Sequence, residues 1–100
     1  MAKEIRWTKE AEETFDSVVS YLQAKWTDKE VSNFINATSK TIFYISENPL
    51  LFRASKKHRI REALVTKHNL LIYSIKPKHI DLISFWDTRK NPKKKHNRKK

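Results

Sequence analysis

The spacing of hydrophobic residues changes once along this 100-residue chain, near residue 50, and this change limits the possible folds more than any other feature. In the first half, apolar residues recur every three or four positions, which is typical of amphipathic helices. From residue 60 onward they alternate or gather in short β-branched and aromatic runs, which is typical of strands. Two consecutive helices followed by several strands predict an α+β fold rather than alternating βαβ units.

The helical half divides into two helices. Thr8 is suited to cap the first, and acidic residues follow it where the helix dipole favours negative charge. Thr27 and Glu30 have the spacing of a capping box and predict a second start, while Asn48-Pro49 predicts its end. The two stripes are Ala11, Phe15, Val18, Val19, Leu22 and Trp26, then Val31, Phe34, Ile35, Thr38, Ile42 and Ile45. The very short connection predicts an antiparallel helical hairpin.

Four strands are expected, at residues 4–7, 60–66, 70–75 and 80–86. Short turns at 67–69 and 76–79 predict antiparallel pairing of the last three. The predicted architecture is a two-layer α+β fold, strand–helix–helix–strand–strand–strand, with the hairpin on one face of an antiparallel sheet. The predicted core pairs helix and strand residues: Phe15, Val19, Leu22, Phe34, Ile35 and Ile42 against Leu64, Ile72 and Leu82.

Composition excludes several classes of protein. Cysteine is absent, so disulfide scaffolds, thiolate metal sites and cysteine nucleophiles are excluded, and the absence of glycine excludes P-loops and Rossmann fingerprints. No apolar run approaches the length of a membrane span, and the N-terminus lacks a signal-peptide core. We therefore expect a cytoplasmic protein that does not associate with membranes.

Charge is distributed unevenly along the chain. Residues 1–50 hold six Lys or Arg against eight Asp or Glu, whereas residues 51–100 hold sixteen against three. A surface this basic favours a polyanion or an acidic protein as partner, although surface lysines also serve solubility alone. Eight of the last twelve residues are Lys or Arg, so we expect one domain over 1–92 and a basic flexible tail over 93–100.

Few catalytic arrangements fit this sequence. No histidine pair or carboxylate cluster has the spacing of a metal site, and no cofactor is expected. What remains is a set of cations that can hold phosphates or stabilise a phosphoryl-transfer transition state. These cations are Lys56, Lys57, Arg59, Arg61, Lys67 and Arg89. Arg59 and Arg61 lie two apart on a predicted strand and share a face, which fits a functional pair and a solvated strand start equally well.

Two segments in the second half of the chain resemble those of a known protein family. The run I-R-E-A-L-V-x-K-x-x-L-L-I-Y-S-I (60–75), followed by I-D-L-I-S-F-W-D-T-R-K-N-P (80–92), resembles the RelE/ParE superfamily of bacterial toxins over residues 3–92. The resemblance implies the toxin half of a type II toxin–antitoxin system, also known as a plasmid stabilisation protein. It further implies a cognate antitoxin as partner in a hetero-oligomer.

The superfamily divides by target. A RelE-like member is a ribosome-dependent mRNA endonuclease without a metal, and by position Lys57, Arg59, Arg61 and Arg89 would supply its cations. Leu70 stands where many relatives carry arginine, and no Tyr or His follows Arg89, so His68 is the nearest proton-transfer group. A ParE-like member inhibits DNA gyrase by binding, and the sequence favours this interpretation. A non-toxic basic nucleic-acid-binding domain is the remaining alternative.

The resemblance also points to residues that would contact the target or the antitoxin, namely Arg61, Tyr73, Trp86, Asp87 and Arg89. Structural roles compete with this interpretation at several of them. Tyr73 lies on a core strand, where a packed ring with a satisfied hydroxyl is the more common role. Trp86 is also expected to pack. Asp87 and Arg89 are close enough in sequence to form a local ion pair that orders the end of the strand.

Overall fold

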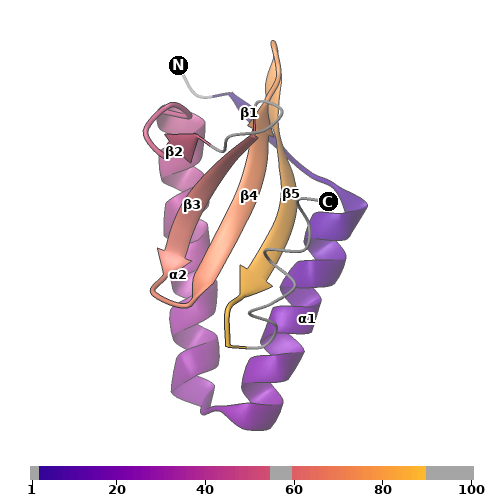
Figure 1. Cartoon of the computed structure of the whole chain (residues 1–100), viewed down its shortest axis with the longest axis vertical. Coiled ribbons are helices and arrows are strands. Elements are labelled where there is room, and N and C mark those ends of the chain that lie inside the picture. The colour runs from indigo at the N-terminus through magenta and orange to yellow at the C-terminus, as the bar shows by residue number, and fades with distance from the viewer. Residues whose placement is uncertain (1–2, 55–59, 90–100) are drawn as a thin grey trace.

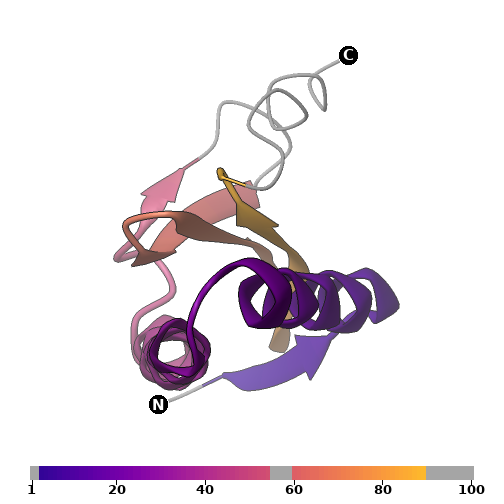
Figure 2. The same ribbon diagram turned by 90° about the horizontal axis from the view of Figure 1, so that it is seen from below.

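The computed structural model describes residues 3–54 and 60–89, which form two helices and five strands. In chain order these are β1 (Glu4–Trp7), α1 (Lys9–Lys25), α2 (Asp28–Glu47), β2 (Arg53–Ala54), β3 (Ile60–Thr66), β4 (Asn69–Ile75) and β5 (His79–Asp87). The helices lie side by side behind strands β3 to β5 (Figure 1), and the view along the long axis shows both on the same side of these strands (Figure 2). The predicted two-layer α+β fold is confirmed.

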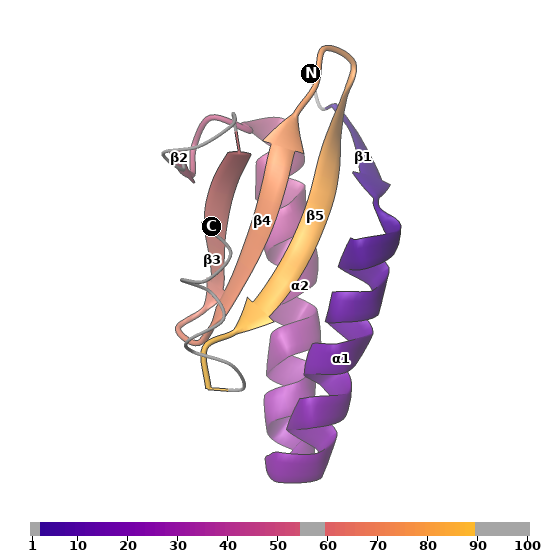
Figure 3. The same ribbon diagram turned by 45° about the vertical axis from the view of Figure 1, so that its right-hand side comes forward.

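Both predicted helix starts are present. The Thr8 hydroxyl accepts a hydrogen bond from the Ala11 N–H, and the Thr27 hydroxyl accepts one from the Glu30 N–H. Only two residues lie between the helices, Trp26, which caps the end of α1, and Thr27, which caps the start of α2. Because the turn is so tight, α1 and α2 run antiparallel past the end of the sheet, as Figure 3 shows.

The sheet has the order β1-β5-β4-β3-β2 and is mixed rather than wholly antiparallel. Strands β2 to β5 pair antiparallel, as the short turns require, but β1 pairs parallel to β5, with Ile5 opposite Ile80. The expectation of an antiparallel sheet is therefore wrong for β1. The hairpin returns the chain to the starting end of the sheet, and the meander of β3, β4 and β5 then leaves β5 pointing the same way as β1.

Two side chains of the α1 region bind the backbone of β5 beside a bulge. Ile72 pairs with Ser84 but Tyr73 pairs with Leu82, so Ile83 is an extra residue in β5. The Thr14 hydroxyl of α1 accepts the Phe85 N–H at 2.9 Å just beyond this bulge. The backbone N–H and the hydroxyl of Thr8 both donate to the Leu82 carbonyl. Two threonines of the α1 region thus bind backbone groups where the regular ladder is interrupted.

The core lies between the sheet and the hairpin. Leu22, Phe34 and Leu82 are buried there as predicted, and Phe15, Val19 and Ile42 pack partly buried against the core. Phe34 stacks on Phe15 with ring centroids 5.3 Å apart.

Three core predictions are wrong. Ile72 is buried, but it lies opposite Glu62 and two residues from Leu70, on the face of the sheet away from the helices. Ile35 is 41% exposed, because the buried stripe of α2 follows Phe34, Thr38, Thr41 and Ile45 and so lies on one side of Ile35. Leu64 is 59% exposed, because the neighbouring Ala63 occupies the helix-facing side of β3 and successive strand residues point to opposite faces. Close packing of α2 against β3 favours the small side chain at that position.

Candidate functional site: two polar clusters at opposite ends of the sheet

The predicted site residues that the structure describes fall into two separate groups. Arg61 and Tyr73 are cross-strand partners on β3 and β4 and therefore share a face. Asp87 ends β5, opposite Asn69 at the start of β4. Tyr73 lies four residues along β4 from Asn69, which is roughly 13 Å at strand spacing. Arg61 and Arg89 thus do not belong to one site.

Arg61 and Tyr73 fasten the segment that follows α2. The Arg61 guanidinium donates to the Phe52 carbonyl at 2.7 Å, and the Tyr73 hydroxyl donates to the Pro49 carbonyl at 2.6 Å. Tyr73 is fully buried in the core, on the helix-covered face of the sheet. Its burial raises the pKa of the phenol to about 12, against a smaller opposing effect of the Arg61 charge. In this structure both side chains bind the protein's own backbone.

The second group is built around a two-residue ion pair at the end of β5. Nε and Nη2 of Arg89 donate to the two carboxylate oxygens of Asp87 at 3.1 and 2.9 Å, and the Arg89 backbone N–H donates to the same carboxylate at 2.8 Å. The local ion pair considered in the sequence is therefore present and bidentate. Such pairing fixes the plane of the guanidinium as well as its position.

Asp87 is only 2% exposed, and its charge is compensated locally. Burial would raise the pKa of this carboxyl, but hydrogen bonds from Arg89 and from the Asn69 amide outweigh burial and lower it. The Asn69 amide nitrogen donates to Asp87 at 2.8 Å, and its oxygen accepts from the Thr66 hydroxyl at 2.5 Å. The same pairing with Asp87 raises the pKa of Arg89. Asp87 therefore remains ionised and serves to position Arg89.

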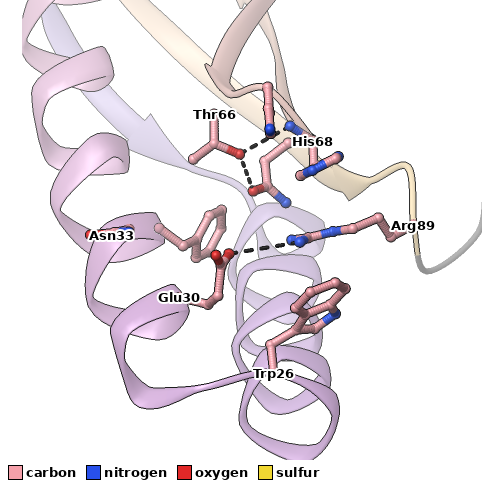
Figure 4. A pocket seen from close by; sticks show the side chains of 9 residues that line it. Trp26, Glu30, Asn33, Thr66, His68 and Arg89 are labelled. Atoms are coloured by element: carbon pink, nitrogen blue, oxygen red, sulfur yellow. Dashed lines mark hydrogen bonds and ion pairs between the residues drawn. The ribbon is translucent and has the colours of Figure 1, made fainter.

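Arg89 reaches from the sheet to the turn of the helical hairpin. Its guanidinium carbon lies 4.5 Å from the centre of the Trp26 ring, and its Nη1 lies 3.7 Å from the Glu30 carboxylate. These residues border a cavity of about 310 Å³, the hinge cleft, which Figure 4 shows from close by. The hinge cleft is lined by Trp26, Glu30, Asn33, Phe34, Thr66, Lys67, His68, Asn69 and Arg89. The lining combines the apolar ring of Phe34 with cations, amides and one carboxylate.

His68 reaches the same cleft from the turn between β3 and β4. Its backbone N–H donates to the Thr66 hydroxyl, and its carbonyl accepts from the Thr88 N–H at 2.9 Å. The structure therefore brings His68, Asp87 and Arg89 together at the end of the sheet that is away from Arg61 and Tyr73. Trp86 pairs with Leu70 on the face away from the helices and is half-buried. The candidates Lys57 and Arg59 lie outside the described residues, as does the segment 93–100.

Sequence reasoning missed Trp26, Glu30 and Asn69 as site residues. The capping box did place Glu30 in the first turn of α2, directly after Trp26, but nothing local connects them to a residue about sixty positions later. Within the described residues, no three His, Asp or Glu side chains are grouped as metal ligands would be. Neither helix has the length and apolar character needed to span a membrane.

Solved structures with this fold come from several bacteria. The chain is similar to a structure of the chromosomal ParDE toxin–antitoxin system from P. aeruginosa, at a TM-score of 0.72 and 12% identity, covering 86% of this chain and 96% of that one. It is also similar to the YoeB dimer from Staphylococcus aureus (TM-score 0.57, 18% identity, 84% and 94% covered). A third is the E. coli DinJ–YafQ toxin–antitoxin complex (0.59, 13%, 91% and 98%). At such low identity these likenesses show a shared fold.

The family is shown by the sequence itself. No curated protein sequence matches the chain. The family model described as the ParE toxin of the type II toxin–antitoxin system parDE matches residues 5–92, which include both helices, strands β2 to β5, all of β1 but its first residue, and the Asp87–Arg89 pair. The chain therefore belongs to the ParE toxin family, within the RelE/ParE superfamily of type II toxin–antitoxin toxins.

Proposed function

We propose that this toxin inhibits growth by binding DNA gyrase, without cleaving RNA, and that a cognate antitoxin neutralises it in a hetero-oligomer. The family model is that of ParE toxins, and the ParDE structure has the highest TM-score of the three similar structures described above. The ParDE structure belongs to a toxin–antitoxin system, and the DinJ–YafQ structure is a toxin–antitoxin complex. Both support an antitoxin as the partner of this chain as well.

One observation carries the choice of binding over catalysis. A metal-free nuclease needs cations that converge on one scissile phosphate. Arg61 and Arg89, the described arginines that the resemblance assigns to catalysis, lie near opposite ends of β4, and each makes hydrogen bonds to the protein itself. Leu70, at the position where many nuclease relatives carry arginine, supplies no charge. This arrangement supports a toxin that recognises its target as a surface.

The second candidate is a ribosome-dependent mRNA endonuclease, and one observation favours it. His68 and Arg89 line the same cleft, so a group able to transfer protons lies near a cation. Lys57 and Arg59 would have to supply the remaining charge. In this alternative the hinge cleft, rather than Arg61, would be the catalytic centre.

The experiment that separates the candidates is induction of the protein in cells, followed by parallel assays for gyrase-dependent DNA damage and for mRNA cleavage. DNA damage with intact mRNA, abolished in a strain with a resistant gyrase, is the expected result. Ribosome-dependent mRNA cuts that disappear in His68→Ala would establish the nuclease instead. Normal growth after induction would leave the non-toxic nucleic-acid-binding domain.

A further inference from the structure

The guanidinium of Arg89 has one edge committed to Asp87 and another edge open. Nε and Nη2 donate to the Asp87 carboxylate, but the nearest acidic oxygen to Nη1 is that of Glu30, at 3.7 Å. This distance is too long for a hydrogen bond. Among residues 3–54 and 60–89, Nη1 has no hydrogen-bond acceptor. It therefore presents unused N–H groups to the hinge cleft.

The open edge of the guanidinium is fixed in position by its neighbours. The plane of the guanidinium is fixed by Asp87, which is itself held by Asn69, and the Trp26 ring covers its face. The Arg89 side chain is only 15% exposed. A charge-assisted hydrogen bond is strong where water is excluded, and little side-chain entropy remains to be lost at a preorganised group.

Glu30 interacts only weakly with Nη1 of Arg89. Its side chain is 40% exposed and makes only the long contact to Nη1. Its place in α2 is fixed by the backbone, since the Glu30 N–H donates to the Thr27 hydroxyl. The carboxylate can therefore turn out to solvent while the helix cap stays intact.

The charges of the hinge cleft favour a carboxylate ligand over a phosphate. Asp87 neutralises Arg89, and Glu30 balances the positive charge of Lys67, which also lines the cleft. A single carboxylate that replaces Glu30 leaves this balance unchanged, whereas a nucleic acid would bring a chain of phosphates toward two carboxylates. The cavity of about 310 Å³ accommodates a side chain, and Trp26, 45% exposed, offers apolar surface for its neighbour.

We propose that the hinge cleft binds an aspartate or glutamate of the antitoxin, whose carboxylate displaces Glu30 from Nη1 of Arg89. The identity of the partner rests on the proposed function, while the chemistry of the cleft rests on the contacts of Arg89. The free toxin thus carries its own competitor for the partner's acidic side chain.

The test is the dissociation constant of the full-length toxin with the antitoxin, taken as the protein encoded by the adjacent reading frame. Glu30→Gln removes the competing carboxylate and should tighten binding roughly two- to five-fold, the factor of a half-exposed ion pair. Arg89→Lys loses the guanidinium fork and should weaken binding roughly ten-fold or more. With Lys at position 89, Glu30→Gln should have a much smaller effect. Glu47→Gln, on the exposed far end of α2, is the control with the same change of net charge.

The sign of the Glu30→Gln effect decides the proposal even where Arg89→Lys disturbs folding. Unchanged or weaker antitoxin binding by Glu30→Gln, with the wild type still bound and neutralised, would overturn the cleft proposal and leave the proposed function intact. Equal tightening by Glu47→Gln would overturn it too, since the effect would then be one of net charge. A wild-type toxin that does not bind the antitoxin would overturn both proposals.

Discussion

At the scale of single residues, Asp87 is the side chain on which the polar end of the sheet depends. It is buried, ionised, and accepts hydrogen bonds from Arg89 and Asn69, which come from two different parts of the fold. Buried ion pairs add little stability relative to apolar residues, but removal of one partner is costly because the other charge is left uncompensated. Asp87 is therefore the residue whose loss should disturb the hinge cleft most.

We expect Asp87→Asn to lower the free energy of unfolding by about 3 kcal/mol or more, since Arg89 loses its buried counterion. Urea unfolding near neutral pH measures this change. Asp16→Asn, on the exposed side of α1, is the control and should change stability by about 0.5 kcal/mol or less. Equal effects of the two substitutions would contradict the role assigned to Asp87.

The acid stability of the protein should depend on the same carboxyl. Its pKa in the folded protein lies below the ordinary value of 3.8, so folding favours the ionised form. The resulting stability is fully present above the ordinary pKa and is lost as pH falls through the lowered one. Wild type should therefore lose more stability than Asp87→Asn between about pH 5 and pH 2. Parallel curves for the two proteins would refute this.

Tyr73 should give a late step in an alkaline titration. With its pKa raised to about 12, it stays protonated in the folded protein well above the ordinary value of 10.0. Stability linked to Tyr73 is full below the ordinary pKa and is lost as pH rises through the raised one. Phenolate absorbance should show a step near pH 12 that is absent in Tyr73→Phe and retained in Tyr44→Phe. Its persistence in Tyr73→Phe would show that another tyrosine is responsible.

At the scale of helices and strands, the hairpin and the bulge of β5 depend on each other. The Thr14 hydroxyl of α1 is the acceptor for the Phe85 N–H. Thr14→Val keeps the shape and removes the acceptor, so we expect a loss of about 1–3 kcal/mol in unfolding free energy. Thr14→Ser keeps the hydroxyl and should recover most of it. If Ser and Val are equally destabilising, the methyl group rather than the hydrogen bond is what matters.

The two helix starts and the strand ranges were predictable because they depend on residues within four positions of one another, as at Thr8 and Thr27. The parallel pairing of β1 was not, since Glu4 meets His79 only after the whole chain has folded. Leu64 was predicted to lie in the core because it belongs to an apolar strand, but the neighbouring Ala63 is the residue of β3 that is buried there. Alternation alone gives the two faces of a strand but not which one is covered.

The candidate site also combines local contacts that could be predicted with long-range contacts that could not. The pairing of Asp87 with Arg89 is local and could be expected from the sequence. The contact of Arg89 with Trp26 and Glu30 joins residues about sixty positions apart, and no local pattern encodes it. Arg61 and Arg89 looked alike as cations in the sequence, and only the strand register separates them.

At the scale of the whole molecule, Arg61 and Arg89 of this ParE-family toxin lie near opposite ends of the sheet, so these two arginines do not converge on one phosphate. A binder of this kind acts by stoichiometry and an enzyme by turnover. The most direct measurement is therefore a titration of the purified toxin into a DNA supercoiling reaction driven by gyrase, with a translating ribosome reaction in parallel. The account predicts that supercoiling falls as toxin approaches the gyrase concentration and that mRNA stays intact. Unaffected supercoiling, together with multiple mRNA cuts per toxin molecule, would contradict it.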